Sequence, residues 1–191
     1  MLIDLSSKPY IRYVSIFKNF KKEAGTSLTH DHSQIVAIPF VPRIIEVEID
    51  ASQKFYNKKN EEKGSRLIFQ YDCFIVFTSY ASIQPMEFWI IPKRHDNTII
   101  NLTKYEKRVF AKTLKKSLAA LRLLVNDPAY NYGFHISLSK KTNEHYHWHL
   151  EVFYKLSIWA GFEKNTGVYI NTVLPERDAL ELRKIIKNNS L

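Results

Sequence analysis

The chain has 191 residues, of which 45% are hydrophobic and 25% are charged, a composition that suits one or two small globular domains. Its 28 Lys and Arg residues exceed its 19 Asp and Glu residues, and the net charge of +9 favours an anionic ligand. A lysine-rich surface without any specific ligand would give the same net charge. The single cysteine, Cys73, excludes an intramolecular disulfide. The sequence has neither a signal-peptide pattern nor an apolar run of membrane length, so we expect a cytoplasmic protein without a membrane partner.

The N-terminal third of the chain predicts a pair of strands followed by a helical connector. Residues 12–20 and 32–40 are rich in aromatic and β-branched side chains, and a polar, glycine-containing segment separates them. Residues 42–65 read as a mainly helical connection to the rest of the chain.

Residues 66–154 predict strands around one long helix. The helix, residues 103–126, has apolar side chains at helical spacing, and Thr103 followed by Glu106 is the pattern of a capping box. The flanking segments predict strands at residues 66–81, 85–95, 131–139 and 145–154. A final helix follows at residues 175–189. This β-β-α-β-β order predicts an α+β fold in which the helix covers one face of an antiparallel sheet.

The chain contains an internal repeat. An offset of 115 residues pairs His30 with His145, His32 with His147 and Gln34 with His149. The second copy has strands and a long helix upstream, whereas the first has no room for them. We therefore expect a truncated first unit with its connector, residues 1–65, and a complete second unit with a C-terminal helix, residues 66–191.

The second histidine cluster suits a metal. Alternation along a strand places His145, His147 and His149 on one face, with Glu151 next in line. Converging imidazoles are typical ligands of a transition metal.

The first histidine cluster suits a nucleophile instead. His30, His32 and Gln34 would share a face of their strand. They follow the segment EAGTSL, in which Gly25 allows the backbone to approach a phosphate closely and Ser27 offers a hydroxyl donor. An imidazole surrounded by anion-binding donors is the arrangement that attack on phosphorus requires.

Several blocks of the sequence resemble the galactose-1-phosphate uridylyltransferase family of the histidine-triad superfamily. The block FKNFKKEAGTSLTHDHSQIVAIPFVP is similar to that family's active-site block, and QPMEFWIIPKRH, YNYGFHIS, HYHWHLE and AGFEKNTGVYIN follow in the family's order. The resemblance covers residues 11–184 and implies tandem histidine-triad-like units, with an antiparallel sheet and helices.

The resemblance implies a nucleotidyltransferase that moves a nucleoside monophosphate between a nucleotide sugar and a sugar phosphate or phosphate. It places the nucleophile at His32, which would form a nucleotidyl-histidine intermediate, and the phosphoryl-binding amide at Gln34. It places nucleotide and phosphate contacts at Asn19, Gly25 and Ser27.

The resemblance also implies a structural metal, zinc or iron. The expected ligands are Glu48, His135, His147 and His149, with Glu46 as the alternative to Glu48. A further residue, Glu163, falls on a hexose-contacting glutamate that family members offer across a dimer interface.

The sequence departs from the family pattern in three ways. The family's HPH is HDH here, so Asp31 places a carboxylate beside the expected nucleophile. The upstream half-domain of the family has no counterpart in the chain. Of the residues that hold a first zinc in many members, only His30 is present. A partner polypeptide could supply the half-domain, a homodimer could cover the sheet edge, or the protein could bind without turnover.

The sequence leaves open two alternatives to transfer through His32. His147 could be the nucleophile of a histidine-triad nucleotide hydrolase or phosphorylase, or the chain could be a non-catalytic, metal-stabilised nucleotide-binding protein. Nucleic acid is not the expected partner, because the basic residues are spread along the chain rather than grouped in a stripe.

Overall fold

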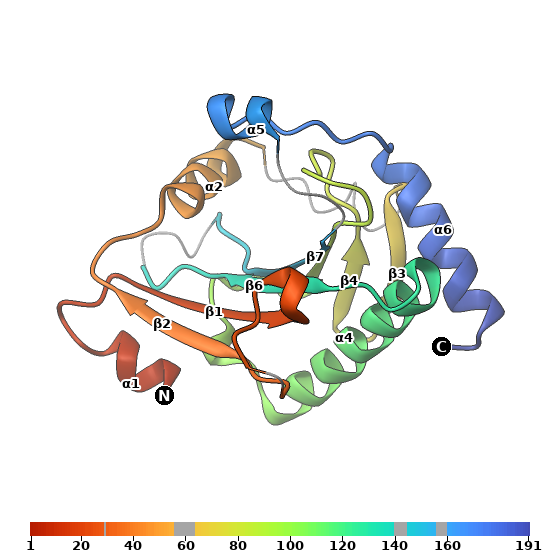
Figure 1. Cartoon of the computed structure of the whole chain (residues 1–191). Helices are drawn as coiled ribbons and strands as arrows, with labels where there is room; N and C mark the ends of the chain where they lie inside the picture. Colours follow the sequence, from red (N-terminus) through yellow and green to blue (C-terminus); the bar gives the residue numbers. More distant parts are fainter. Residues whose placement is uncertain (29, 56–63, 140–144, 156–159) are drawn as a thin grey trace.

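The structure, a computed structural model, describes the chain except for residues 29, 56–63, 140–144 and 156–159 (Figure 1). The elements in chain order are α1 Leu2–Ser6, β1 Tyr13–Phe20, the 3-10 helix η1 Lys22–Ala24, β2 Gln34–Ile38, α2 Arg43–Phe55, β3 Leu67–Tyr71, β4 Phe74–Phe77, β5 Phe88–Pro92, the 3-10 helix η2 Ile99–Asn101, α4 Lys104–Val125, β6 Tyr130–His135, β7 His149–Tyr154, α5 Gly161–Thr166 and α6 Pro175–Asn188.

The strands form one seven-stranded antiparallel sheet in the order β2-β1-β6-β7-β5-β4-β3. The predicted α+β class with an antiparallel sheet is therefore confirmed. The offset of 115 residues recurs in the strands, since β2 begins at Gln34 and β7 begins at His149. The hairpins β1–β2 and β6–β7 meet where β1 pairs with β6, so the two predicted units contribute to a single sheet.

One predicted strand is in fact two. Residues 66–81 fold into the hairpin β3–β4, in which Tyr71 pairs with Phe74 across a two-residue turn. Asp72 has a φ of 48° there, a left-handed conformation that Asp tolerates better than most residues. The aromatic and β-branched residues on both sides hid this turn in the sequence. The strand order before α4 is consequently β-β-β rather than β-β.

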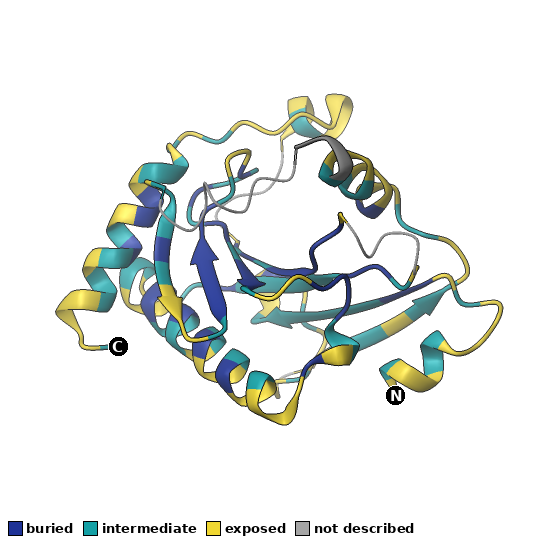
Figure 2. Ribbon diagram, turned by 180° about the vertical axis from the view of Figure 1, so that it is seen from behind, coloured by how far each residue is buried: buried dark blue, intermediate teal, exposed yellow. Residues whose placement is uncertain are grey.

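The two faces of the sheet have different coverings (Figures 1 and 2). Helices α4 and α6 pack on one face, where alternate strand residues form the main hydrophobic core around the fully buried Trp148. Helix α2 lies over the opposite face, which carries a smaller apolar cluster and the polar side chains predicted to have functional roles (Figure 1). The candidate functional side chains thus project from the face that α4 and α6 leave open.

The predicted long helix is confirmed together with its caps. At the start of α4, the Thr103 hydroxyl accepts a hydrogen bond from Glu106 N at 3.1 Å, and the Glu106 carboxylate accepts one from Thr103 N at 2.8 Å. The final helix α6 carries Pro175 in its first turn, where proline costs no hydrogen bond. The predicted connector contains α2, and its residues 56–63 lie outside the described residues.

None of the helices in the described part of the chain combines the length and the apolar character that a membrane span requires.

Candidate functional site

His32 is held in the form that a nucleophile needs. Its Nδ1 lies 3.0 Å from the carbonyl oxygen of His30, and because a carbonyl can only accept, Nδ1 carries the proton. The lone pair is then on Nε2, which lies 3.4 Å from Nε2 of Gln34, an amide nitrogen that can only donate. The backbone of His30 therefore orients the ring, while the exposed His30 ring lies 5.6 Å from that of His32.

The carboxylate of Asp31, the residue that departs from the family pattern, is balanced by a cation. Its Oδ2 lies 3.4 Å from Nζ of Lys18. Along β1 the side chain of Lys18 alternates with those of Phe17 and Asn19, so it projects from the opposite face of the sheet. The negative charge is thereby drawn away from the face that carries Asn19.

The glycine-containing loop is anchored to the sheet through Asn19. Gly25 has a φ of 87°, a left-handed conformation that favours glycine, and its carbonyl accepts a hydrogen bond from Nδ2 of Asn19 at 3.3 Å. Asn131 on β6 donates to Oδ1 of Asn19 at 2.7 Å and to the carbonyl of Ala24 at 2.9 Å. Ser27, the other predicted phosphate contact, is exposed beyond this turn. Asn131 was not predicted, because its role depends on the pairing of β1 with β6.

A single row of side chains connects the two predicted sites. Reading across the strands, the paired positions are Gln34, Phe17, Gly133, Glu151 and Trp89. Residues paired in this way project from the same face of a sheet. At about 4.8 Å per strand, Gln34 lies about 10 Å from Gly133, which is two residues from His135.

Three of the four predicted metal ligands converge over this face. Oε1 of Glu48 lies 2.8 Å from Nδ1 of His135, and Oε2 of Glu48 lies 4.0 Å from Nε2 of His149. One ligand atom from each of the three residues lies within 4.8 Å of the others. The hydroxyl of Tyr146 donates to Oε2 of Glu48 at 2.9 Å and holds the carboxylate in place. Glu46 is on a different side of α2, because residues two apart on a helix do not face the same way.

The protonation of this group fits a metal cation. His149 Nδ1 lies 3.3 Å from the carbonyl of His147, so Nε2 has the lone pair, and that buried atom has no hydrogen-bond partner among the described residues. Burial, together with the nearby His135, lowers the pKa of His149 to about 4. Burial alone would raise the pKa of Glu48, but the hydrogen bond from His135 and both imidazoles bring it below its usual value. Burial alone would lower the pKa of His135, but the hydrogen bond to Glu48 and the charges of the nearby carboxylates raise it, so a metal bound at Nδ1 would displace the proton there. A carboxylate and imidazoles whose ligand nitrogens carry no proton suit zinc or iron.

His147, the fourth predicted ligand, does not join this group. Its Nε2 lies 2.8 Å from the carbonyl oxygen of Pro92, so this nitrogen carries a proton that it donates away from Glu48. The expected alternation along residues 145–149 does not apply, because β7 begins only at His149. The same hydrogen bond and the burial of the ring make His147 unsuited to nucleophilic attack through Nε2.

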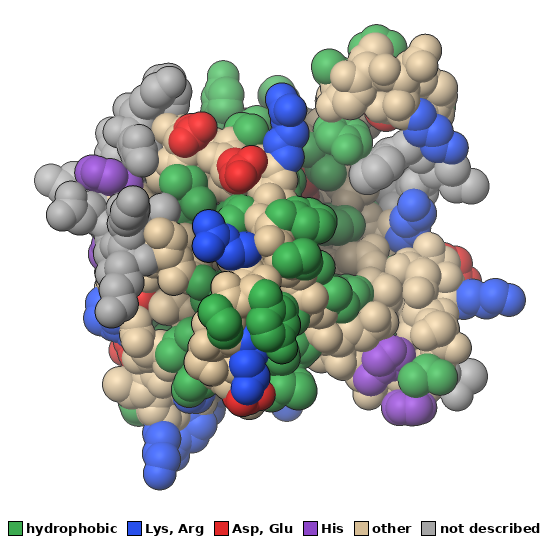
Figure 3. Space-filling model, turned by 90° about the vertical axis from the view of Figure 1, so that its left-hand side faces the viewer, with side chains coloured by type: hydrophobic (Ala, Val, Ile, Leu, Met, Phe, Trp, Pro, Cys, Tyr) green, Lys and Arg blue, Asp and Glu red, His purple; other side chains and the backbone are tan. Residues whose placement is uncertain are grey.

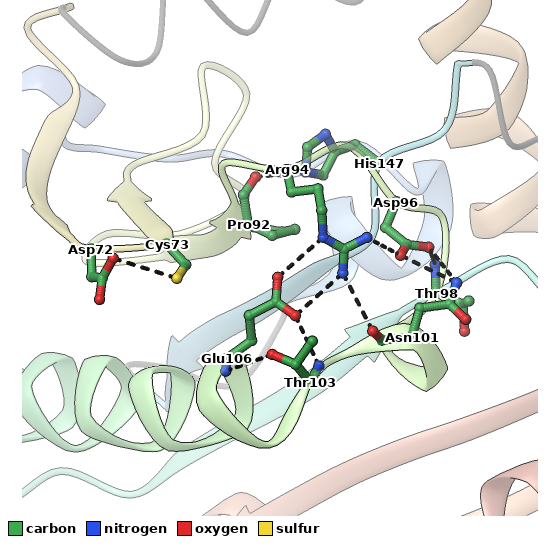
Figure 4. Close-up of polar contacts among 10 residues, drawn as sticks. All are labelled: Asp72, Cys73, Pro92, Arg94, Asp96, Thr98, Asn101, Thr103, Glu106 and His147. Atoms are coloured by element: carbon green, nitrogen blue, oxygen red, sulfur yellow. Dashed lines mark hydrogen bonds and ion pairs between the residues drawn. The ribbon is translucent and has the colours of Figure 1, made fainter.

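A polar network fixes the segment beside His147 (Figure 4). Arg94 donates from Nη1 to Oδ2 of Asp96 at 2.7 Å and from Nε to Oε1 of Glu106 at 3.1 Å, joining the segment after β5 to the start of α4. The backbone carbonyl of Asp96 accepts a hydrogen bond from Trp148 N at 2.9 Å. The approach to β7 is thus anchored on both sides of His147.

Two carboxyl groups lie next to the candidate metal ligands, on the side of His135 that faces away from Glu48. Oε2 of Glu151 lies 3.3 Å from Nε2 of His135, the nitrogen that faces away from Glu48. The side chain of Glu87 contacts Glu151, and burial followed by the Glu151 charge raises the pKa of Glu87 to about 8. Glu87 therefore holds its proton at neutral pH and can donate it to Glu151. The alternation of HYHWHLE indicated Glu151, whereas no sequence signal indicated Glu87.

Glu163 lies on the short helix α5. Its Oε2 accepts a hydrogen bond from Ala160 N at 3.1 Å, which caps the first turn of that helix. Figure 1 shows α5 near α2, above the sheet. The predicted contact of Glu163 with a sugar involves a second copy of the chain and stays a prediction.

The family model for the C-terminal domain of galactose-1-phosphate uridyl transferase matches residues 13–157. The ADP-glucose phosphorylase of Arabidopsis thaliana is 33% identical over 184 residues, which are 92% of this chain and 52% of that protein. A crystal structure of an ADP-glucose phosphorylase from the same plant, with bound ADP-glucose, superposes with a TM-score of 0.87 at 32% identity and covers 96% of this chain and 62% of that one. The galactose-1-phosphate uridylyltransferase of Thermotoga maritima is 34% identical over 199 residues, 95% of this chain and 63% of that protein.

The chain thus spans between half and two thirds of the length of these relatives. A zinc-bound histidine triad family protein from Mycobacterium smegmatis, 14% identical with a TM-score of 0.50, shares the fold. The family match covers most of the chain, and it includes both histidine clusters and the strands that carry them. By this match, the chain belongs to the galactose-1-phosphate uridyl transferase family.

Proposed function

We propose that the protein is a nucleotidyltransferase that moves a nucleoside monophosphate between a nucleotide sugar and a sugar phosphate or inorganic phosphate through a covalent intermediate on His32. The observation that carries this proposal is the state of His32, whose Nδ1–H is bound to the His30 carbonyl and whose Nε2 lone pair faces the Gln34 amide. The names of the relatives, a uridylyltransferase and an ADP-glucose phosphorylase, support the same class of chemistry.

The first half-reaction would begin with attack of His32 Nε2 on the phosphorus next to the nucleoside. A phosphorus–nitrogen bond forms, the bond from phosphorus to the bridging oxygen breaks, and the sugar phosphate leaves with that electron pair. Positive charge develops on the imidazole, and the His30 carbonyl stabilises it through Nδ1–H. The Gln34 amide is placed to donate to a phosphoryl oxygen.

The second half-reaction reverses these bonds. An oxygen of the acceptor phosphate attacks the same phosphorus, the phosphorus–nitrogen bond breaks, and His32 regains its Nε2 lone pair. Asn19 and the Gly25 loop would hold the phosphate groups during both steps, because Asn131 fixes their relative positions through two hydrogen bonds. The acceptor phosphate enters along the path by which the sugar phosphate left in the first half-reaction. One site can therefore bind both the leaving sugar phosphate and the acceptor.

The proposed metal would be held by Glu48, His135 and His149, and we assign it a structural role. When bound, zinc or iron would supply a crosslink between α2, which carries Glu48, and the strands β6 and β7. Gly133, which is two residues from His135, lies about 10 Å from Gln34 across the sheet, so the metal would sit apart from His32 and no reaction step needs it.

A protein partner would complete the site. β2 lies at one edge of the sheet, and among the described residues no strand pairs with its outer side. Figure 3 shows hydrophobic side chains gathered on this side of the molecule. The exposed apolar residues of α1, β2, α2 and the segments that join them to their neighbours include Ile3, Tyr10, Val36, Phe40, Ile44 and Val47. An open edge and an apolar surface together favour association. The partner would be a second copy, which would offer Glu163 to the sugar, or a polypeptide that adds strands to β2. Light scattering on the purified protein, alone and with co-purifying chains, separates the two.

The test of the proposed function is the intact mass of the protein after incubation with UDP-glucose and, separately, with ADP-glucose, quenched at alkaline pH because nucleotidyl-histidine bonds are acid-labile. We expect a mass increase of one nucleoside monophosphate, which identifies the base, and no increase in His32→Ala. The matched control is His147→Ala, which should still form the adduct. An adduct lost with His147→Ala and kept with His32→Ala would replace the proposal with a nucleophile in the second cluster. Binding without any adduct would support a non-catalytic nucleotide-binding protein.

A further inference from the structure

Lys21, the residue that follows β1, has a backbone conformation that is almost confined to glycine. Its φ is 68° and its ψ is 162°, a combination that the Cβ atom of any other residue makes unfavourable. Such conformations persist only where surrounding contacts hold them, and they cluster at functional sites. Lys21 is also the first residue of the glycine loop, which we define as residues 21–26. Contacts that hold the backbone of Lys21 therefore also set the path of this loop.

The backbone carbonyl of Lys21 closes the glycine loop. It accepts hydrogen bonds from Ala24 N at 3.2 Å and from Thr26 N at 3.3 Å. The next carbonyl, that of Lys22, accepts a hydrogen bond from Gly25 N at 2.9 Å. A different backbone conformation at Lys21 would turn its carbonyl away from the two amides that it binds. The shape of the loop that presents Gly25 thus depends on the conformation of Lys21.

The side chain of Lys21 joins the start of the loop to the turn between α4 and β6. Its Nζ donates to Oδ2 of Asp127 at 2.8 Å and also to the backbone carbonyl of the same residue. Nε of Arg122 lies 3.1 Å from Oδ1 of Asp127, so both carboxylate oxygens have a cationic partner. The hydrogen bond from Lys21 lowers the pKa of Asp127 below its usual value, so this carboxylate is charged at neutral pH.

The turn that carries Asp127 has a well-defined backbone of its own. Asn126 and Asp127 have φ values of 56° and 58°, a left-handed conformation in which Asn and Asp are enriched. Asn126 is the C-cap of the 22-residue helix α4, and Asp127 N donates to the carbonyl of Arg122 at 2.9 Å. Asp127 is therefore held at the end of a long helix that packs on the core, and it offers Lys21 a fixed partner.

The same connection contacts the glycine loop a second time. Asn131, four residues after Asp127, donates to the carbonyl of Ala24 at 2.9 Å and to Oδ1 of Asn19 at 2.7 Å. Residues 126–131 thus bind the loop at its start, through Lys21, and in its middle, through Ala24. The contact at Ala24 alone would leave the strained start of the loop without support.

We propose that Lys21 and Asp127 are positioning residues for the transfer through His32. Their ion pair holds the strained start of the glycine loop, so that the Gly25 backbone and Asn19 stay placed for the phosphate groups of the donor. The inference rests on the proposed function and adds two residues to it that do not themselves touch the substrate. Direct contact of Lys21 with a phosphate is a different role, and it predicts a different response to the loss of the Asp127 charge.

The first test is the rate of adduct formation in single turnovers, measured by intact mass over a range of UDP-glucose and ADP-glucose concentrations. Lys21→Met should lower the maximal rate about tenfold, because a misplaced phosphate is attacked less often. Asp127→Asn, which keeps the left-handed turn, should lower it about threefold, because a neutral amide oxygen binds the ammonium group more weakly. The donor concentration at half the maximal rate should stay within about threefold in both variants.

The double variant separates the two roles of Lys21. Adding Asp127→Asn to Lys21→Met should slow the reaction no further, because both substitutions remove the same contact. Lys22→Met is the matched control, since it removes the same charge from an exposed neighbour in the same loop, and it should keep the wild-type rate. A wild-type rate in Asp127→Asn, or a further loss of rate in the double variant, would overturn the proposal.

The second test needs no donor and follows the amide hydrogen exchange of Ala24 and Thr26, which donate to the carbonyl of Lys21. Lys21→Met should speed this exchange at least about tenfold, while Lys22→Met should leave it unchanged. Unchanged exchange in Lys21→Met, or faster exchange with a wild-type rate of adduct formation, would overturn the proposal. If the wild-type protein forms no adduct, the proposed function fails, and the exchange alone then decides whether the ion pair holds the loop.

Discussion

Replacing Glu151 with glutamine tests whether the carboxylate behind His135 controls metal retention. The substitution keeps the shape of the side chain and removes its charge. Oε2 of Glu151 lies 3.3 Å from Nε2 of His135, and only 14% and 15% of the two side chains are exposed. A hydrogen bond to a charged group contributes about 1.5–3 kcal/mol, and one between neutral groups about 1 kcal/mol. The difference of about 1.4 kcal/mol corresponds to a tenfold change in affinity, in line with the effect of residues that orient metal ligands.

The assay is competition for zinc between the metal-free protein and a chromophoric chelator at pH 7.5. We expect the dissociation constant of Glu151→Gln to be about tenfold higher than that of the wild type. Glu181→Gln, on the surface of α6, is the matched control and should retain the wild-type value. His149→Leu removes a ligand and should abolish tight binding. If Glu151→Gln binds zinc as tightly as the wild type while His149→Leu does not, the carboxylate does not orient His135 and the reasoning is refuted.

Three further predictions concern stability, each measured by urea unfolding. The native pKa of Glu87 is raised to about 8, so protonated Glu87 stabilises the fold fully at low pH, and this contribution is lost as the pH rises from about 4.5 through 8. The free energy of unfolding should therefore fall by up to about 1.4 kcal/mol per pH unit over this range. Glu87→Gln should flatten this slope, and parallel profiles of the wild type and the variant would contradict the assignment. Gly25→Ala should cost about 1–2 kcal/mol, because the φ of 87° is left-handed, and an unchanged midpoint would show that the loop adapts. Arg94→Met should lower the free energy of unfolding by about 1–3 kcal/mol, because the buried carboxylate of Asp96 loses hydrogen-bond donors, whereas Arg122→Met, at an exposed ion pair, should lower it by less than about 1 kcal/mol. Equal losses of stability in the two variants would contradict the network shown in Figure 4.

The sequence predicted those parts of the fold that depend on local patterns. The capping box and the helical spacing identified α4, and the offset of 115 residues identified two related hairpins. The turn at Asp72 was missed because apolar strand residues continue on both sides of it, which gives a hairpin and a single long strand the same composition.

Local spacing indicated the candidate residues that share one segment, and the family resemblance indicated Glu48, His135 and His149 on separate elements, but neither indicated Asn131. His32 and Gln34 could be recognised because they are adjacent on one segment. The role of Asn131 could not be read locally, since it depends on the register that places Asn131 opposite Asn19. The expectation that His147 shares a face with His149 extended strand alternation into residues that precede β7.

Whether His32 carries the nucleotide during transfer can be measured by digesting the protein after a brief incubation with UDP-glucose or ADP-glucose at alkaline pH. The adduct is then located with tandem mass spectrometry under electron-transfer fragmentation. We expect a nucleoside monophosphate on the peptide that contains His32, with none on the peptide that contains His147. An adduct found on His147, or on any residue other than His32, would contradict it.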